Sequence, residues 1–88
     1  MLDLHTSRIQ ILTEAAESRE REVLGYQIDI DNYHRAIVEA DKDRDMVEFA
    51  QRLRELLLSS IIEQKKAKIM LKVITDQLED GDAAGKNS

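Results

Sequence analysis

The 88-residue sequence has no cysteine, no proline and no tryptophan. Without cysteine the chain has no disulfide framework, no thiolate zinc ligand and no thiol nucleophile, so we expect a reducing, cytoplasmic location. With one Phe and two Tyr, it has few aromatic rings for stacking on nucleic-acid bases. Apolar runs such as 56–58 and 61–62 are no longer than three residues, far below membrane-spanning length. We therefore expect neither secretion nor membrane insertion.

The composition that remains is typical of long helices. Hydrophobic residues make up 42% of the chain and charged residues 35%, which matches coiled coils better than sheet proteins. A chain of this length forms one domain. Its net charge of -5 repels phosphate backbones, so no direct nucleic-acid binding is expected. The sequence therefore predicts a single all-α domain.

Residues 46–78 contain no glycine or proline, and their apolar residues recur in alternating steps of four and three. This spacing is that of a coiled-coil seam and predicts a helix over about 46–79. The seam consists of Met46, Ala50, Leu53, Leu57, Ser60, Gln64, Ala67, Leu71, Ile74 and Leu78, of which Ser60 and Gln64 are polar.

A second seam predicts a helix over about 4–40, with Asp3 or Thr6 as its N-cap. Its members are Ile9, Leu12, Ala16, Arg19, Val23, Tyr26, Ile30, Tyr33, Ile37 and Ala40, of which only Arg19 is charged. Gly25 costs about 1 kcal/mol in a helix interior. The heptad spacing passes through Gly25 unchanged, so a continuous helix is favoured over a break.

The fully charged run 41–45 separates the seams and predicts a hairpin turn, with Asp45 as N-cap and Glu48 completing a capping box. From residue 80 the apolar pattern ends in small polar residues and two glycines. We expect 80–88 to be a disordered tail and 1–79 to be the helical hairpin.

The aspartates at positions 41, 43 and 45 also match the first three ligand positions of a calcium loop. The glycine and the closing glutamate of that loop are replaced by Met46 and Arg52. We therefore expect no metal site there. His5 and His34 lie about 43 Å apart on one helix and cannot share a metal.

Folding at the turn places residue i near residue 86 minus i in an antiparallel two-helix hairpin. Four glutamates of the first helix then run beside four lysines of the second, which favours this orientation. These residues are Glu14, Glu17, Glu20 and Glu22, with Lys72, Lys68, Lys66 and Lys65. Among the polar seam members, Gln64 is expected near Arg19 and Tyr26.

Apolar residues outside the two seams are the candidate partner-binding surface. One partner helix cannot cover both the seam and a second stripe on the opposite side of the same helix. The candidates are Leu24, Ile28, Val38, Phe49, Leu56, Leu58, Ile61, Ile62, Ile69 and Val73. Two hairpins associating into a four-helix bundle, docking of another protein, or both would cover them.

We expect a non-enzymatic interaction or assembly module with no cofactor and no small-molecule substrate, because no phosphate loop, zinc-protease helix or nucleophile elbow is present. The alternative is a small acidic inhibitor that blocks a host enzyme or nucleic-acid-binding protein. A viral regulatory protein would be one example. Its contacts would be Asp29, Asp31, Glu39, Asp41, Asp43 and Asp45.

Overall fold

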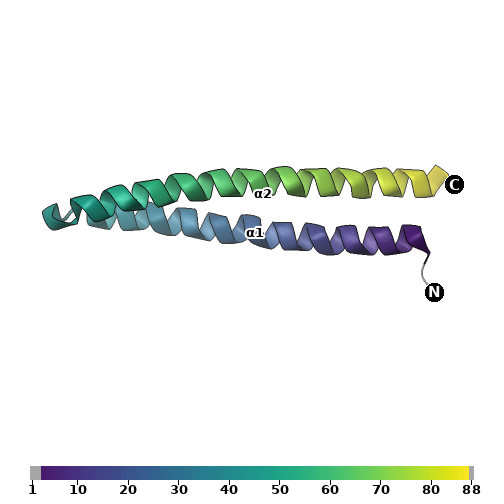
Figure 1. The fold of residues 1–88 in the computed structure, drawn as a ribbon, viewed down its shortest axis with the longest axis horizontal. Helices are drawn as coiled ribbons and strands as arrows, with labels where there is room; N and C mark the ends of the chain where they lie inside the picture. Colours follow the sequence, from purple (N-terminus) through teal and green to yellow (C-terminus); the bar gives the residue numbers. More distant parts are fainter. Residues whose placement is uncertain (1–2, 88) are drawn as a thin grey trace.

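The computed structural model describes residues 3–87, with side chains over 3–80, as two long helices folded back on each other (Figure 1). Helix α1 spans Leu4–Ala40 and α2 spans Val47–Asn87, with the short 3-10 helix η1 at Arg44–Met46 between them. The predicted all-α antiparallel hairpin is confirmed. The molecule measures 66 × 22 × 14 Å, so it is two helices wide and one helix thick.

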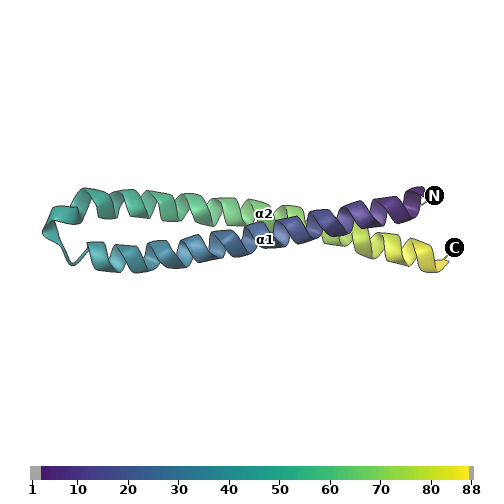
Figure 2. The ribbon, with the colours of Figure 1, turned by 90° about the horizontal axis from the view of Figure 1, so that it is seen from below.

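The two helices wind around each other, as their heptad spacing predicts. Figure 2 shows α1 crossing α2 along the hairpin. Alanine supplies four of the seven buried apolar side chains, and such small residues allow the helix axes to approach closely. The buried set is Ala16, Ile30, Ala40, Ala50, Leu53, Ala67 and Ile74. Each lies at a predicted seam position, so the seam forms the core.

Helix α1 begins at a side-chain cap. The Asp3 carboxylate accepts a hydrogen bond from the backbone N–H of Thr6 at 2.7 Å, so Asp3 and not Thr6 is the cap. This hydrogen bond lowers the pKa of Asp3 because it stabilises the charged carboxylate.

Gly25 does not break α1, as the unchanged heptad spacing favoured. Among the described residues no glycine has a positive φ. A Cβ built on Gly25 would meet no heavy atom of the described chain within 4 Å, leaving aside the helix's own nearby backbone. The hairpin itself therefore gives no packing reason for glycine at this position.

Replacing Gly25 with alanine is expected to raise the free energy of unfolding by about 1 kcal/mol, because alanine loses less backbone entropy in a helix. Urea unfolding at low micromolar concentration, where association contributes least, measures this gain. Ser18→Ala, an exposed change on the same helix, is the control and should give a smaller gain. A loss of stability in Gly25→Ala would contradict an open, regular helix at this residue.

The turn differs from the prediction in its cap. The Asp43 carboxylate, not that of Asp45, accepts the capping hydrogen bond, from the backbone N–H of Asp45 at 2.9 Å. The chain makes one 3-10 turn before α2, which begins at Val47, so the cap is needed two residues earlier than predicted. The Asp45–Glu48 capping box is therefore not the device that starts α2.

Helix α2 continues to Asn87, beyond the end predicted at residue 79. The segment has no proline, and its two glycines each cost about 1 kcal/mol in a helix without forbidding it. Ala83 and Ala84 favour the helix. The predicted tail 80–88 is thus helical in backbone through Asn87, while Ser88 lies outside the described residues.

The pairing near the turn is four residues away from the predicted register. Ala40 and Ile37 pack with Ala50 and Leu53, so the paired residue numbers sum to about 90 instead of 86. The turn and η1 extend to Met46, which moves the centre of the hairpin toward α2. The predicted orientation was right, but its register was wrong by about one helical turn.

Candidate association surfaces

Contacts between the helices define two broad faces of the hairpin. With the seam at heptad positions a and d, the e positions of antiparallel helices share one side and the g positions share the other. Arg54 and Asp41, both at e, form an ion pair at 2.6 Å. Arg8 and Gln77, both at g, form a hydrogen bond at 2.9 Å. The heptad position of each other residue then gives the face on which it lies.

We call the side with the g and c positions the alanine face. On α1 this face includes four small residues, on α2 it includes three large apolar residues at g positions, and its other g positions are polar or charged. The small set is Ala15, Ser18, Gly25 and Ala36, and the large set is Phe49, Leu56 and Met70. Phe49 and Met70 are exposed, whereas Ala36 and Leu56 are partly buried. The two helices thus present unequal edges to the same side.

We call the opposite side, with the e and b positions, the lysine face, after Lys65, Lys68 and Lys72. The predicted ion pairs between these lysines and glutamates of α1 are not formed within residues 3–80. Lys72 instead binds Asp76 on its own helix at 3.0 Å, and this contact raises the pKa of Lys72. Pairs four residues apart on one helix form without tying two helices together. The predicted charge match therefore gives no glutamate–lysine ion pair between the helices in this part of the chain.

A buried polar layer lies near the middle of the seam. Gln64 is 6% exposed and donates hydrogen bonds to the backbone oxygen of Val23 at 3.1 Å and to Oε1 of Gln27 at 3.0 Å. The predicted neighbour Arg19 instead binds Glu22 on its own helix at 3.1 Å. The shifted register explains this difference, because it brings Gln64 opposite Gln27, a residue outside the seam that the sequence analysis missed.

Four exposed apolar side chains on or beside the outer edge of α2 form what we call the outer stripe: Ile62 and Ile69 lie on the edge, Leu58 on its lysine-face side and Val73 on its alanine-face side. Leu58 is 62% exposed, Ile62 50%, Ile69 63% and Val73 45%. Their predicted exposure is confirmed. Because they face away from α1, the hairpin alone leaves them in water.

The ten apolar candidates do not form one patch. Phe49 and Leu56 lie on the alanine face, and Leu24, Val38 and Ile61 lie on the lysine face. Ile28 lies on the outer edge of α1, and the remaining four form the outer stripe. All except Leu56 and Ile61 are exposed. The structure therefore offers several apolar surfaces rather than a single site.

All six acidic candidates are exposed, and most of them have local partners. Asp31 accepts from Gln27, Glu39 binds Lys42, and Asp41 binds Arg54. Asp43 is the cap of η1. Within the described part of the chain, no group of three or more His, Asp or Glu side chains is arranged to hold a metal ion.

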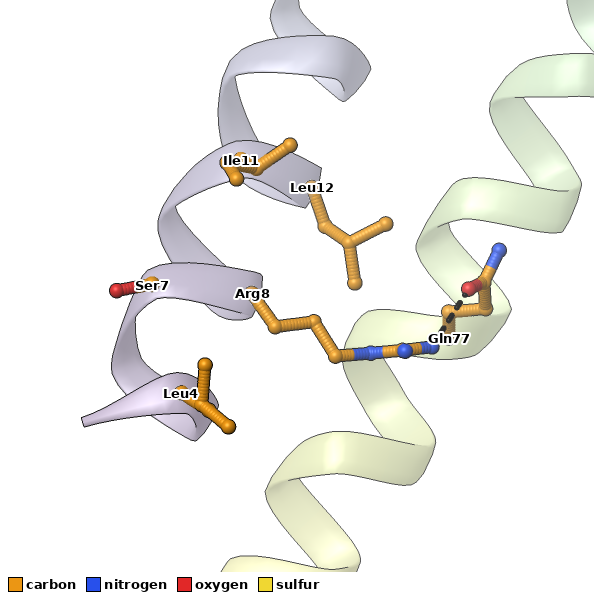
Figure 3. A pocket seen from close by; sticks show the side chains of 6 residues that line it. All are labelled: Leu4, Ser7, Arg8, Ile11, Leu12 and Gln77. Carbon is orange, nitrogen blue, oxygen red and sulfur yellow. Dashed lines mark hydrogen bonds between the residues drawn. The ribbon is translucent and has the colours of Figure 1, made fainter.

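An open cleft of about 330 Å³ lies at the end of the hairpin away from the turn (Figure 3). Its lining residues are Leu4, Ser7, Arg8, Ile11, Leu12 and Gln77. The hydrogen bond from Arg8 to Gln77 crosses it between the two helices. Four of these residues lie at g or c positions, so the cleft belongs to the alanine face. Sequence reasoning missed it because most of these residues lie outside the seams.

The fold defines the chain as an all-α antiparallel helical hairpin. No family model, curated protein or solved structure matches it. Over the described residues, neither helix has the length of apolar sequence needed to cross a bilayer.

Proposed function

We propose that this protein is a non-enzymatic interaction module that binds protein through apolar surfaces outside its seam. The observation that carries the proposal is the exposed outer stripe. Its four side chains point away from α1, so a more tightly packed hairpin would still leave them uncovered. Leu58 with Ile62, and Ile69 with Val73, are each four residues apart and so neighbours on the helix surface. Exposed groups of apolar side chains of this kind mark protein contacts.

The small core supports the same proposal. Among residues 3–80, thirteen large hydrophobic side chains are at least 40% exposed, whereas seven apolar residues are buried. A chain of this size gains little stability from its own core, and association is one of the usual ways to increase it. Binding a second protein would both cover the apolar surface and stabilise the hairpin.

The acidic-inhibitor alternative has less support from the contacts. An inhibitor of a basic channel needs carboxylates that are free to bind the target. Asp41 and Asp43 hold the turn together, so a target would have to displace Arg54 or the cap of η1. Of the six candidates, Asp29 and Asp45 have no side-chain hydrogen bond or ion pair within residues 3–80.

The double substitution Ile62→Glu with Ile69→Glu tests the outer stripe. Burying unpaired charge costs several kcal/mol, so bound protein should be lost while the seam keeps the hairpin helical. Affinity capture, sedimentation and circular dichroism measure partner binding, association and helicity. Gln51→Glu with Lys65→Gln is the control, because it makes the same change in net charge at exposed polar positions of α2 that lie off the alanine face.

The control should keep every partner that the wild type captures. The proposal fails when the wild type is strictly monomeric and the Ile62→Glu, Ile69→Glu protein still captures the same partners as the wild type.

A further inference from the structure

We infer that the alanine face binds a second copy of this chain, with the two-fold axis parallel to the long axis of the hairpin, to form a four-helix bundle. The inference rests on the proposed function and names one partner and one face. With this axis, α1 of each copy lies against α2 of the other, and all neighbouring helices run antiparallel.

The two edges of the alanine face are complementary in size under this symmetry. Using the observed register, in which paired numbers sum to about 90, Ala15 and Ser18 lie opposite Val73 and Met70 of the second copy. Ala36 similarly lies opposite Leu56. Large side chains of one α2 therefore meet small side chains of the other α1, as ridges meet grooves in helix packing. The symmetry makes each contact twice.

Three charged pairs on this face are of opposite sign, whereas Asp29 and Glu63 bring two negative charges together. Arg8 lies opposite Asp80 of the second copy, Glu22 opposite Lys66, and Glu39 opposite Arg52. Glu63 and Asp29 are the acidic neighbours at the centre, and Lys66, which binds Glu63 at 2.9 Å, lies beside them. Opposite charges at the rim of an interface favour this alignment of the two copies over a shifted one.

Gly25 supports the same face. The hairpin places nothing of the described chain near its missing Cβ, yet this residue carries the entropic cost of glycine in a helix. Gly25 lies in the middle of the alanine face, where α2 of the second copy would pass. Glycine at such a crossing lets two helices approach closely. Packing against the second copy would therefore account for glycine at this position, whereas packing within the single hairpin does not.

The available area is large enough. A slab 66 Å long and 22 Å wide presents roughly 1,400 Å² on each broad face, and a standard interface buries about 800 Å² per partner. The open cleft near Arg8 lies within this footprint, where the same register brings Gln77 and Asp80 of the second copy closest to Ile11. Covering a little more than half of the face is therefore sufficient.

The lysine face is the competing surface for a second copy. Five of the ten g positions on the alanine face are apolar, at residues 15, 36, 49, 56 and 70. On the lysine face, the e positions over 13–75 include apolar side chains only at Val47 and Ile61. Four of these ten positions are charged on each face, so the cost of burying charge is similar and the number of apolar side chains, five against two, favours the alanine face.

The neighbouring residues Leu24 and Gly25 separate the two faces in one experiment. Both are exposed on α1, Leu24 on the lysine face and Gly25 on the alanine face. In sedimentation equilibrium at about 50 µM, the wild type and Leu24→Arg should have the mass of two chains, and Gly25→Arg the mass of one. Arginine is a good helix former, so circular dichroism should show helicity retained in both variants.

Dissociation of Leu24→Arg with retention of the Gly25→Arg dimer would overturn the inference in favour of the lysine face. A monomeric wild type that still loses partners on Ile62→Glu with Ile69→Glu would overturn the dimer and leave the proposed function intact. A monomeric wild type whose partner binding is unaffected by that double substitution would overturn both the dimer and the proposed function.

A charge exchange tests the contact between Glu22 and Lys66. Glu22→Lys and Lys66→Glu each place like charges opposite each other twice, so each protein alone should dissociate at least about tenfold more readily than the wild type. An equimolar mixture should restore the wild-type association, because every pair is then of opposite charge. No restoration in the mixture would overturn this contact between copies.

The orientation is tested with a spin label at Glu48→Cys, which is on the outer edge of α2 near the turn in a chain without native cysteine. Parallel hairpins place the two labels at the same height, within roughly 30 Å of each other, whereas antiparallel hairpins place them roughly 50 Å apart. The longer distance would overturn the proposed symmetry axis.

Discussion

Replacing Leu53 with alanine is expected to lower the free energy of unfolding by about 2–5 kcal/mol. Leu53 is 5% exposed and packs with Ala40 and Ala50 in the buried cluster next to the turn. Its neighbours are already small, so little material can move to fill the cavity. Because the core is so limited, this loss is a large share of the total stability. Urea unfolding followed by circular dichroism measures it.

Leu58→Ala is the matched control for this substitution. It removes the same atoms from the same helix at a side chain that is 62% exposed. At a protein concentration low enough to keep the chain monomeric, its effect should be within about 0.5 kcal/mol. Equal losses for the two substitutions would show that the buried seam near the turn is not formed as described.

Replacing Gln64 with leucine is expected to raise stability by about 1–2 kcal/mol and to weaken the preference for one register. The side chain is buried and bonded to Val23 and Gln27. The Val23 carbonyl can keep its bond within α1, and Gln27 is exposed to water, so neither partner loses all its hydrogen bonds. Thermal unfolding and sedimentation should show a higher midpoint and a mixture of association states.

Gln27→Leu separates the effect of burying the Gln64 amide from the effect of its hydrogen bonds. It removes one of the two bonds of Gln64 but leaves the amide in the seam, so it should lower stability. A Gln64→Leu protein that is less stable than the wild type and has one association state would contradict the role of Gln64 as a register-setting polar layer.

The fold could be predicted because a local repeat in the sequence, the heptad, determines where each helix lies. The heptad pattern continues through Gly25 and stops at Ala40, so a continuous helix over about 4–40 was predicted, and α1 spans Leu4–Ala40. The turn was harder to predict. Asp41, Asp43 and Asp45 are alike as capping residues, and only the closing geometry of the hairpin selects Asp43. One extra 3-10 turn then shifted the pairing of the two helices.

The candidate surfaces were predicted as a set of exposed residues but not as an arrangement. Exposure of Ile62 or Ile69 follows from spacing along one helix. Whether Leu24 shares a face with Leu56 follows from the heptad once the antiparallel orientation is known, because the e and b positions share one side and the g and c positions the other. The ion pair of Arg54 with Asp41, both at e, agrees with this assignment, which separates Leu24 from Leu56.

Photo-crosslinking in the expressing cell, from a photoreactive amino acid at position 69, tests most directly whether the outer stripe is a protein contact. The same group at position 76 is the control, because Ile69 and Asp76 occupy equivalent heptad positions one repeat apart. The account predicts a discrete crosslinked protein at position 69 and little or none at position 76. No crosslink at position 69, or the same products at both positions, would contradict it.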